Sequence, residues 1–198
     1  MSTTPTASPS STTIEVTVTD NDGGSDTKTV SLTITGTNDL PVLTVDATGG
    51  VTEDASNPNL TDSGALSFTD VDVNNTHSVT ELYNNDISWS GGNLTSVLSA
   101  GQIQSLIDGF SVDSDGWDYS ILNSDVQFLA LGETITLSFE VTVTDNDGGT
   151  DTKTVSLTIT GTNDLPVLTV DATGGVTEDA SNPNLTDSGA LSFTDVDV

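Results

Sequence analysis

Acidic side chains stand at short spacing in the segment TVTDNDGGTDTKTVSLTITGTNDLPVLTV, residues 142–170. Asp145 and Asp147 lie two apart in an Asp/Asn/Gly turn sequence, and Asn163 and Asp164 come just before a Leu-Pro pair. Carboxylate, amide and backbone oxygens that converge from turns are the ligands of Ca²⁺, which takes about six to eight of them. These acids are therefore either ordinary turn formers or calcium ligands.

The charge balance of the whole chain favours the recruitment of cations. The 198 residues include thirty Asp and Glu but only two basic residues, Lys28 and Lys153, and the formal charge is −28. Such an excess repels itself in any compact state. Because so few basic groups cannot neutralise phosphates, we expect neither nucleic acid nor an anionic membrane surface as a partner.

Other functional classes are disfavoured by the residues that the sequence lacks. There is no cysteine, and His77 is the only histidine, so multi-His metal sites and Cys/His nucleophile pairs are excluded. No run of about 18 apolar residues predicts a membrane span. Two carboxylates acting as a glycosidase need one carboxyl in an apolar pocket, whereas these acids lie in turn sequences, so we expect no enzyme.

An internal repeat sets the organisation of the chain. Residues 16–73 recur at 141–198, a shift of 125 residues, and the only difference between them is Ser25 against Thr150. The chain therefore holds one whole period between the tail of one copy and the head of the next, as expected of a piece of a tandem array.

Domain boundaries follow from local signals around the repeated GTNDLP sequence. Val16 and Val18 alternate with polar residues before a DNDGG turn, and Val30, Leu32 and Ile34 alternate after it, which predicts a β-hairpin with these residues inward. Glycine and proline then break the strand. We predict a disordered leader or expression tail at 1–13, the hairpin of a preceding copy at 14–38, a complete unit at 39–163 and the start of the next copy at 164–198.

The complete unit reads as an all-β antiparallel sandwich of about seven strands. A short helix is predicted in SAGQIQSLIDG, because its apolar residues recur at helical spacing, Ser99 and Gln102 can form a capping box, and Gly109 can end the helix. The predicted strands are 42–46, 65–69, 77–82, 86–90, 117–121, 134–144 and 153–160.

The segments GVTEDASNPNLTDSGALSFTDVDVNNTHSV and WDYSILNSDVQFLALGETITLSFEVTVTDNDGGTDTKTVSLTITGTNDLP resemble the VCBS repeat of large bacterial surface proteins, including RTX-type adhesins. The match covers both ends of the unit and is weakest over residues 83–112, which read as a variable insertion. The resemblance implies a cadherin- and immunoglobulin-like sandwich, calcium, secretion to the bacterial cell surface and an adhesin stalk. TNDLP is similar to the Asn-Asp-x-x-Pro linker of cadherins, with one residue here between Asp and Pro.

Candidate metal ligands are the acids at predicted domain ends. Asp70 and Asp72 stand two apart, so in an extended segment both carboxylates face the same way and need a cation or wide spacing. DNDGG also resembles part of an EF-hand loop, but the glutamate needed at the twelfth position is absent. Turn chemistry alone remains the alternative for Asp145 and Asp147. The candidates are Asn38, Asp39, Glu53, Asp54, Asp70, Asp72, Asp145, Asp147, Asn163, Asp164, Asp195 and Asp197; a secondary oxygen-rich loop, read as a solvated turn, holds Asp113, Asp115 and Asp118.

Two functions remain open at the level of sequence. In the first, the repeat is a spacer whose calcium stiffens a stalk, and its neighbours are other repeats of the chain. We expect the pairs Asp145/Asp147 and Asp195/Asp197 to close on the same ion or ions at the linker 161–166. In the second, the repeat itself binds a glycan or mediates homophilic cell–cell or biofilm contact. Trp89 and Trp117 discriminate between them, since we expect both to fill the core rather than to line a sugar platform.

Overall fold

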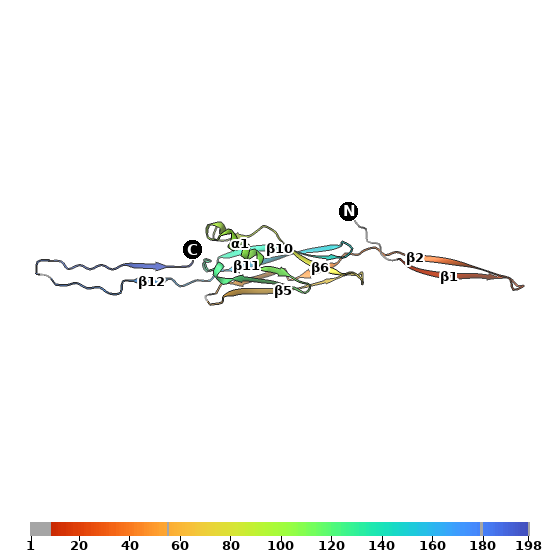
Figure 1. Cartoon of the computed structure of the whole chain (residues 1–198), viewed down its shortest axis with the longest axis horizontal. Helices are drawn as coiled ribbons and strands as arrows, with labels where there is room; N and C mark the ends of the chain where they lie inside the picture. The colour runs from red at the N-terminus through yellow and green to blue at the C-terminus, as the bar shows by residue number, and fades with distance from the viewer. Residues whose placement is uncertain (1–8, 55, 179, 198) are drawn as a thin grey trace.

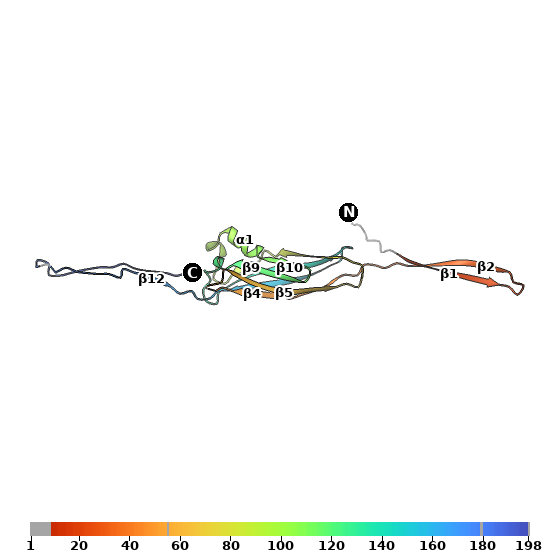
Figure 2. The same cartoon turned by 60° about the horizontal axis from the view of Figure 1, so that its bottom comes forward.

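The computed structural model describes residues 9–54, 56–178 and 180–197. A central unit of two sheets carries a two-stranded arm at each end, and the arms extend in opposite directions (Figures 1 and 2). The N-terminal arm pairs β1 (Ser10–Thr19) with β2 (Ser25–Ile34), and the C-terminal arm pairs β12 (Val167–Val170) with β13 (Leu191–Thr194). Within the described residues, no helix is long and apolar enough to cross a membrane.

The central unit is built from a five-stranded and a four-stranded sheet. One sheet has the order β4-β11-β10-β6, with β7 also on β10, and the other has the order β3-β5-β9-β8. All pairs are antiparallel except β4 with β11. The strands are β3 (Val42–Val45), β4 (Thr48–Thr52), β5 (Asn59–Thr69), β6 (His77–Tyr83), β7 (Ser88–Trp89), β8 (Phe110–Val112), β9 (Gly116–Leu122), β10 (Thr134–Asp145) and β11 (Thr150–Thr160).

One hydrophobic core joins the two sheets, as alternation along the strands requires. Val141 and Val143 of β10 and Leu157 of β11 are fully buried on one face of their hairpin. Trp117 of β9 is 2 % exposed, and its indole passes so close to Gly64 that a Cβ there would lie 2.3 Å from the ring. These observations confirm the prediction of a mostly β, sandwich-type fold and place Trp117 in the core.

The predicted short helix is present with the predicted start and end. Helix α1 (Ala100–Asp108) begins after Ser99, which forms the predicted capping box with Gln102, and it ends at Gly109. Two 3₁₀ turns, Leu94–Ser96 and Asn123–Asp125, accompany it.

Other strands were missed or differ in length. The strand β4 has the sequence TGGVT, which has low strand propensity because glycine is depleted in strands, yet it is held by a ladder to the edge of β11. The three-residue β8 and the first half of β5 were also missed, and β7 is shorter than predicted. In the N-terminal arm, β1 starts at Ser10, so residues 10–13 belong to the strand rather than to the predicted leader; residues 1–8 lie outside the described residues.

Both arms keep the strand register of the central unit. Glu15 pairs with Thr29 in the N-terminal arm as Glu140 pairs with Thr154 in the central hairpin. Likewise, β12 and β13 are aligned as β3 and β5 are, with every partner shifted by 125 residues. The repeated sequence therefore specifies the local pairing by itself.

The apolar faces of the arms are exposed, against the expectation that the hairpin residues point into a core. Leu32 is 52 % exposed whereas its equivalent Leu157 is 1 % exposed, and Leu168 is 63 % exposed whereas Leu43 is 2 % exposed. The reason is that no second sheet covers either arm among the described residues.

This difference predicts unequal effects of one substitution at two equivalent positions. Leu157→Ala should destabilise the central unit by about 2 to 5 kcal/mol, because it opens a cavity in the core. Leu32→Ala removes the same atoms from an exposed face and should leave the unfolding midpoint of the unit unchanged. Tryptophan fluorescence in a urea titration measures this unit selectively, since Trp89 and Trp117 are the only tryptophans. Equal shifts in both variants would contradict the assignment of the core.

Candidate cation sites at the two ends of the central unit

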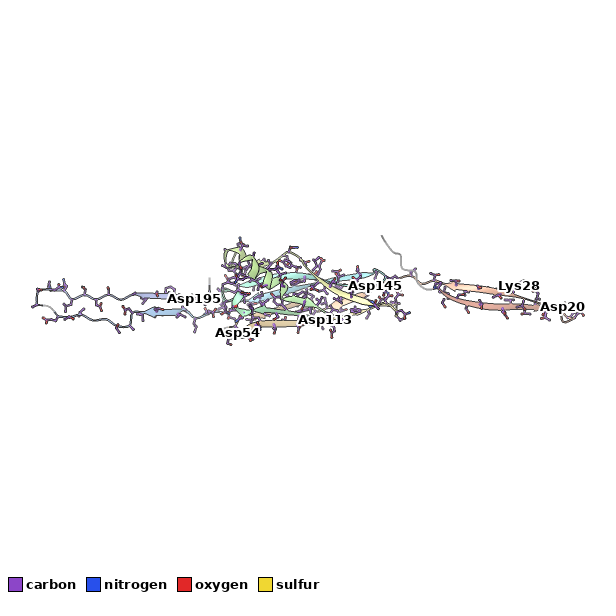
Figure 3. All side chains as sticks on the ribbon, in the orientation of Figure 1. Asp20, Lys28, Asp54, Asp113, Asp145 and Asp195 are labelled. Carbon is purple, nitrogen blue, oxygen red and sulfur yellow. The ribbon has the colours of Figure 1, made fainter. Side chains whose placement is uncertain are left out.

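Acidic and amide side chains gather where each arm meets the central unit. The N-terminal joint comprises the linker 35–41 with the loops 70–77 and 145–149. The C-terminal joint comprises the linker 161–166 with residues 53–54 and 195–197. Figure 3 shows Asp145 at the end nearest the N-terminal arm and Asp54 and Asp195 at the opposite end.

Hydrogen bonds tie the N-terminal linker to both loops of its joint. The Asn38 side-chain amide donates to Asp145 Oδ2 at 3.0 Å, and the backbone N–H of Asp39 donates to Asp72 Oδ2 at 2.7 Å. Asn75 donates to the side-chain oxygen of Asn38 at 3.1 Å. The structure thus brings together four of the predicted ligands, Asn38, Asp39, Asp72 and Asp145.

Asp145 organises the turn between β10 and β11. Its Oδ1 accepts the N–H groups of Asp147 at 2.8 Å and Gly149 at 2.7 Å, while Gly148 takes a positive φ of 93° that suits glycine. Burial acts to raise the pKa of Asp145, but the hydrogen bonds from Asn38 and from the turn N–H groups outweigh it, so the pKa is lowered. The ionised form of Asp145 is therefore favoured, and its carboxylate binds both the turn and the linker.

Asp70 is paired with the only histidine. His77 Nε2 lies 2.8 Å from Asp70 Oδ2, the Asp70 side chain is 3 % exposed, and the histidine ring packs on Phe68. The N–H of Asp72 donates to Asp70 Oδ1 at 2.9 Å. This hydrogen bond, followed by that of His77, lowers the pKa of Asp70.

Each of the two lysines is paired with an aspartate that is not one of the predicted ligands. Lys28 pairs with Asp26 in the N-terminal arm at 2.9 Å, and Lys153 pairs with Asp151 on β11 at 2.8 Å. Against thirty acidic residues, these two pairs leave the joint acids without a lysine of their own. Their remaining charge must be balanced from solution.

The C-terminal joint repeats the linker arrangement of the N-terminal joint. In addition, it contains two carboxylate oxygens that lack a hydrogen-bond partner in the described part of the chain. The N–H of Asp164 donates to Asp197 Oδ2 at 3.2 Å, as Asp39 does to Asp72. The N–H of Asp197 in turn donates to Asp195 Oδ1 at 3.3 Å. Asp164 Oδ2 and Asp197 Oδ1 are buried and have no hydrogen-bond partner within the described part of the chain. Buried carboxylate oxygens without a partner are costly, and a bound cation is one way to satisfy them.

Glu53 fastens the C-terminal linker to the sandwich. The side chain is 1 % exposed; its Oε1 accepts Gln127 Nε2 at 2.6 Å, and its Oε2 accepts the N–H of Thr162 at 2.8 Å. Both oxygens are thus used within the protein. Gln127 was not predicted, because no local signal marks a partner so distant in sequence.

Asp54, next to Glu53, forms a turn rather than facing the linker. Its carboxylate accepts the N–H groups of Ser56 and Asn57 at 2.7 and 3.0 Å, and these bonds, with that of the Ser56 hydroxyl, lower its pKa. Asn123, a second missed residue, binds the backbone of Asp54 through both its amide oxygen and its amide nitrogen.

The expectation that Asp145/Asp147 and Asp195/Asp197 close on the same ion or ions at the linker 161–166 is wrong. Asp145 contacts the linker before the unit, whereas Asp197 contacts the linker after it. The turn 145–149 and the linker 161–166 lie at opposite ends of β11, whose eleven residues span about 36 Å at 3.3 Å each. Each joint therefore combines a linker with the Asp-x-Asp pair that follows it in sequence.

The acids of the joints meet as pairs. Among the described residues, no group of three or more His, Cys, Asp or Glu side chains is arranged to hold a metal ion. A cation in either joint would hence need amide and backbone oxygens and water besides two carboxylates, a mixture that Ca²⁺ accepts. In the secondary loop, Asp113 accepts the N–H groups of Asp115 and Gly116 and forms an ordinary turn.

Fold and joints together define an elongated all-β protein with carboxylate pairs at both ends of its sandwich. Comparison with models of known protein families and with curated protein sequences gives no match.

The lowered pKa of Asp145 predicts a pH-dependent contribution to stability. A carboxyl whose folded pKa is depressed stabilises the fold above its unfolded pKa of about 3.9, and this stability disappears as the pH falls through the folded pKa. Asp145→Asn should therefore lower the thermal midpoint at pH 7, and the difference from the unmodified chain should shrink below about pH 4. Asp20→Asn changes the equivalent residue of the exposed arm and serves as the control. A deficit for Asp145→Asn that is the same at pH 3 and pH 7 would contradict the electrostatic origin.

Proposed function

We propose that this chain is a calcium-stiffened extender from the stalk of a secreted bacterial surface adhesin, similar to a VCBS repeat. The observation that carries the proposal is the pair of buried carboxylate oxygens without partners, Asp164 Oδ2 and Asp197 Oδ1, at the junction of two consecutive copies. A divalent cation at this point would satisfy both oxygens and join the linker to the following segment.

Strand order supports an immunoglobulin- or cadherin-like unit. The order β3-β5-β9-β8 corresponds to A-B-E-D of an immunoglobulin sandwich, and β11-β10-β6 corresponds to G-F-C. Such a unit has its chain ends at opposite poles, as the arms do here (Figure 1). Copies that follow one another in sequence then extend end to end, which suits a spacer.

Calcium would act at both joints by the same means. When bound, it supplies positive charge and a set of fixed oxygen contacts. The residues that would hold it are Asn38, Asp39, Asp70, Asp72, Asp145 and Asp147 at the N-terminal joint and Asn163, Asp164, Asp195 and Asp197 at the C-terminal joint. Glu53 uses both carboxylate oxygens within the protein and Asp54 forms a turn, so these two predicted ligands would orient their neighbours rather than bind the ion.

Stiffening follows from the charge of the chain. Without divalent ions, carboxylates on the linker and on the adjacent loops repel one another, and the two lysines are engaged elsewhere. A cation shared between linker and unit reverses this repulsion into attraction, so that the joint resists bending.

The burial of the aromatic residues supports a spacer function rather than a glycan-binding function. Trp117 and Tyr119 are 2 % and 1 % exposed, and the Tyr119 hydroxyl donates to the backbone of Leu106 inside the unit. Trp89 is partly buried, and its indole N–H donates to Glu133 at 3.1 Å. These side chains offer no paired aromatic platform for a sugar.

Calcium should bind to and stabilise the folded chain. A ligand that binds the folded state alone adds about 2.7 kcal/mol at a hundredfold excess over Kd, so the melting temperature should rise in millimolar Ca²⁺ and fall in chelator. Asp164→Ala should weaken calorimetric calcium binding at the C-terminal joint. Asp108→Ala removes the same charge at the end of α1 and should bind as the unmodified chain does. Unchanged melting at fixed ionic strength, or equal binding in both variants, would refute the site.

Rigidity is tested on a chain with two consecutive complete units. Small-angle scattering should give a longer maximum dimension in Ca²⁺ than in chelator, because a closed joint aligns the units whereas an open one bends. Asp164→Ala at the joint between the units should abolish the difference, and Asp108→Ala should retain it. The same dimension in both conditions, with both units folded, would show that calcium does not stiffen the joint.

A further inference from the structure

The two arms are exposed copies of segments that pack against each other inside the central unit. The N-terminal arm has the register of β10–β11 and, from Glu15 onward, their sequence with Ser25 in place of Thr150; the C-terminal arm has the sequence and register of β3 and β5. In the central unit the core-facing apolar residues of these strands are buried or half-buried, whereas in the arms they are exposed. The exposed residues are Ile14, Val16, Val18, Val30, Leu32 and Ile34 in the first arm and Leu168, Val170, Val176, Leu185, Leu191 and Phe193 in the second.

The central unit shows how the two segments fit. Residues 48–52 of β4 run parallel to residues 156–160 of β11 in a continuous ladder. Next to it, the N–H of Leu43 donates to Asp151 Oδ2 at 2.8 Å, and the N–H of Ser156 donates to the carbonyl of Ala47 at 2.9 Å. Beyond the ladder, the N–H of Glu53 donates to the carbonyl of Thr160 at 2.8 Å.

We propose that the C-terminal arm of one copy of this chain binds the N-terminal arm of a second copy in the geometry of β4 on β11. Residues 173–177 then pair with residues 31–35 of the other copy, with Val176 opposite Ile34. All the residues of this ladder are identical to those in the central unit, because the one difference in the repeat, Ser25 against Thr150, lies outside it.

The proposed pairing of one arm with the other joins two molecules, because the arms of one chain point away from each other. They lie at opposite ends of the central unit in both views (Figures 1 and 2). The two surfaces that meet are different, so the contact is head-to-tail, and repetition of it gives open linear assemblies rather than closed dimers.

Exposed apolar area drives this contact and charge opposes it. An isolated two-stranded hairpin is only marginally stable in water, so the N-terminal arm gains from an added edge strand. The strands β12 and β13 that flank residues 173–177 then come to cover its apolar face, as β3 and β5 of the opposite sheet cover β11 in the central unit. Each chain carries a formal charge of −28, which repels a second copy. At 0.15 M salt the screening length is about 8 Å, so association should strengthen from low salt to this ionic strength.

A glycine in the C-terminal arm allows a selective test. In the central unit, a Cβ on Gly50 would lie 2.4 Å from the carbonyl oxygen of Thr158 on β11, so only glycine fits beside that strand. A Cβ on the equivalent Gly175 meets nothing within 4 Å. Gly175→Val is therefore harmless in the separate arm but blocks the proposed ladder.

Sedimentation of the full chain in chelator and 0.15 M salt measures the association. We expect concentration-dependent oligomers, and Gly175→Val should raise the dissociation constant about tenfold or more through the clash. Ser192→Val is the control: it adds the same side chain at the equivalent of Ser67, which is exposed in the central unit. A monomer at all concentrations, or equal association of Gly175→Val and Ser192→Val, would overturn the proposal.

Cross-linking tests the register, and the absence of native cysteine makes it specific. Thr35→Cys in one sample and Thr177→Cys in another should form a mixed disulfide on oxidation, because their equivalents Thr160 and Thr52 are ladder partners. Thr35→Cys with Ser192→Cys should not do so at a comparable rate. Equal rates would refute the register. Both experiments are done without calcium, so their outcome is independent of the calcium-binding proposal.

Discussion

The covering of the β10–β11 hairpin by the second sheet is the contact on which the rest of the structure depends. Val141, Val143, Leu157 and their neighbours become the core only because β3, β5 and β9 lie across them. The same hairpin without a cover, in the N-terminal arm, keeps its register but exposes its apolar face. Hydrogen-bonded pairing and burial are thus separable in this protein, since pairing is local whereas burial needs distant segments.

Long paired strands also separate the acidic groups into two poles. The turn at Asp145 lies at one end of β11, and the linker fastened by Glu53 lies at the other. Each pole then receives the Asp-x-Asp pair of the segment that follows it, so that two similar joints arise from one repeated sequence. Because the two lysines already pair with Asp26 and Asp151, the chain leaves these poles with negative charge that solution ions must balance.

Consecutive copies share this arrangement, which links the proposed function to the exposed arms. The segment that completes the central unit, β4 on β11, has its equivalent in the C-terminal arm at residues 173–177. The same parallel pairing of β4 with β11 closes the sandwich in the central unit. In the arms, the equivalent residues Leu32, Ile34 and Val176 are exposed.

Sequence alone was sufficient for elements whose signals are local. The DNDGG turn and the alternation of Val16, Val18 and Leu32 predicted the strand pairing of the hairpin, though not the exposure of these residues, and the capping box of Ser99 with Gln102 predicted the helix. Strand β4 was missed because its two glycines oppose strand formation and only its partner β11 holds it in place. Gln127 and Asn123 were missed since their contacts with residues 53 and 54 span some seventy positions.

Tertiary structure decided what the repeat could not. Val143 and Val18 stand in the same local sequence, yet they are 0 % and 68 % exposed, because exposure depends on which other segments lie nearby. The types and spacing of the acids marked them as candidate metal ligands, but did not predict which of them lie in the same joint. Spacing along a strand determines the direction of a side chain, whereas the segment that faces it depends on tertiary packing. The sequence by itself determined the pairing, turns and charge of this chain; the packing of distant strands determined which residues are core and which acids share a joint.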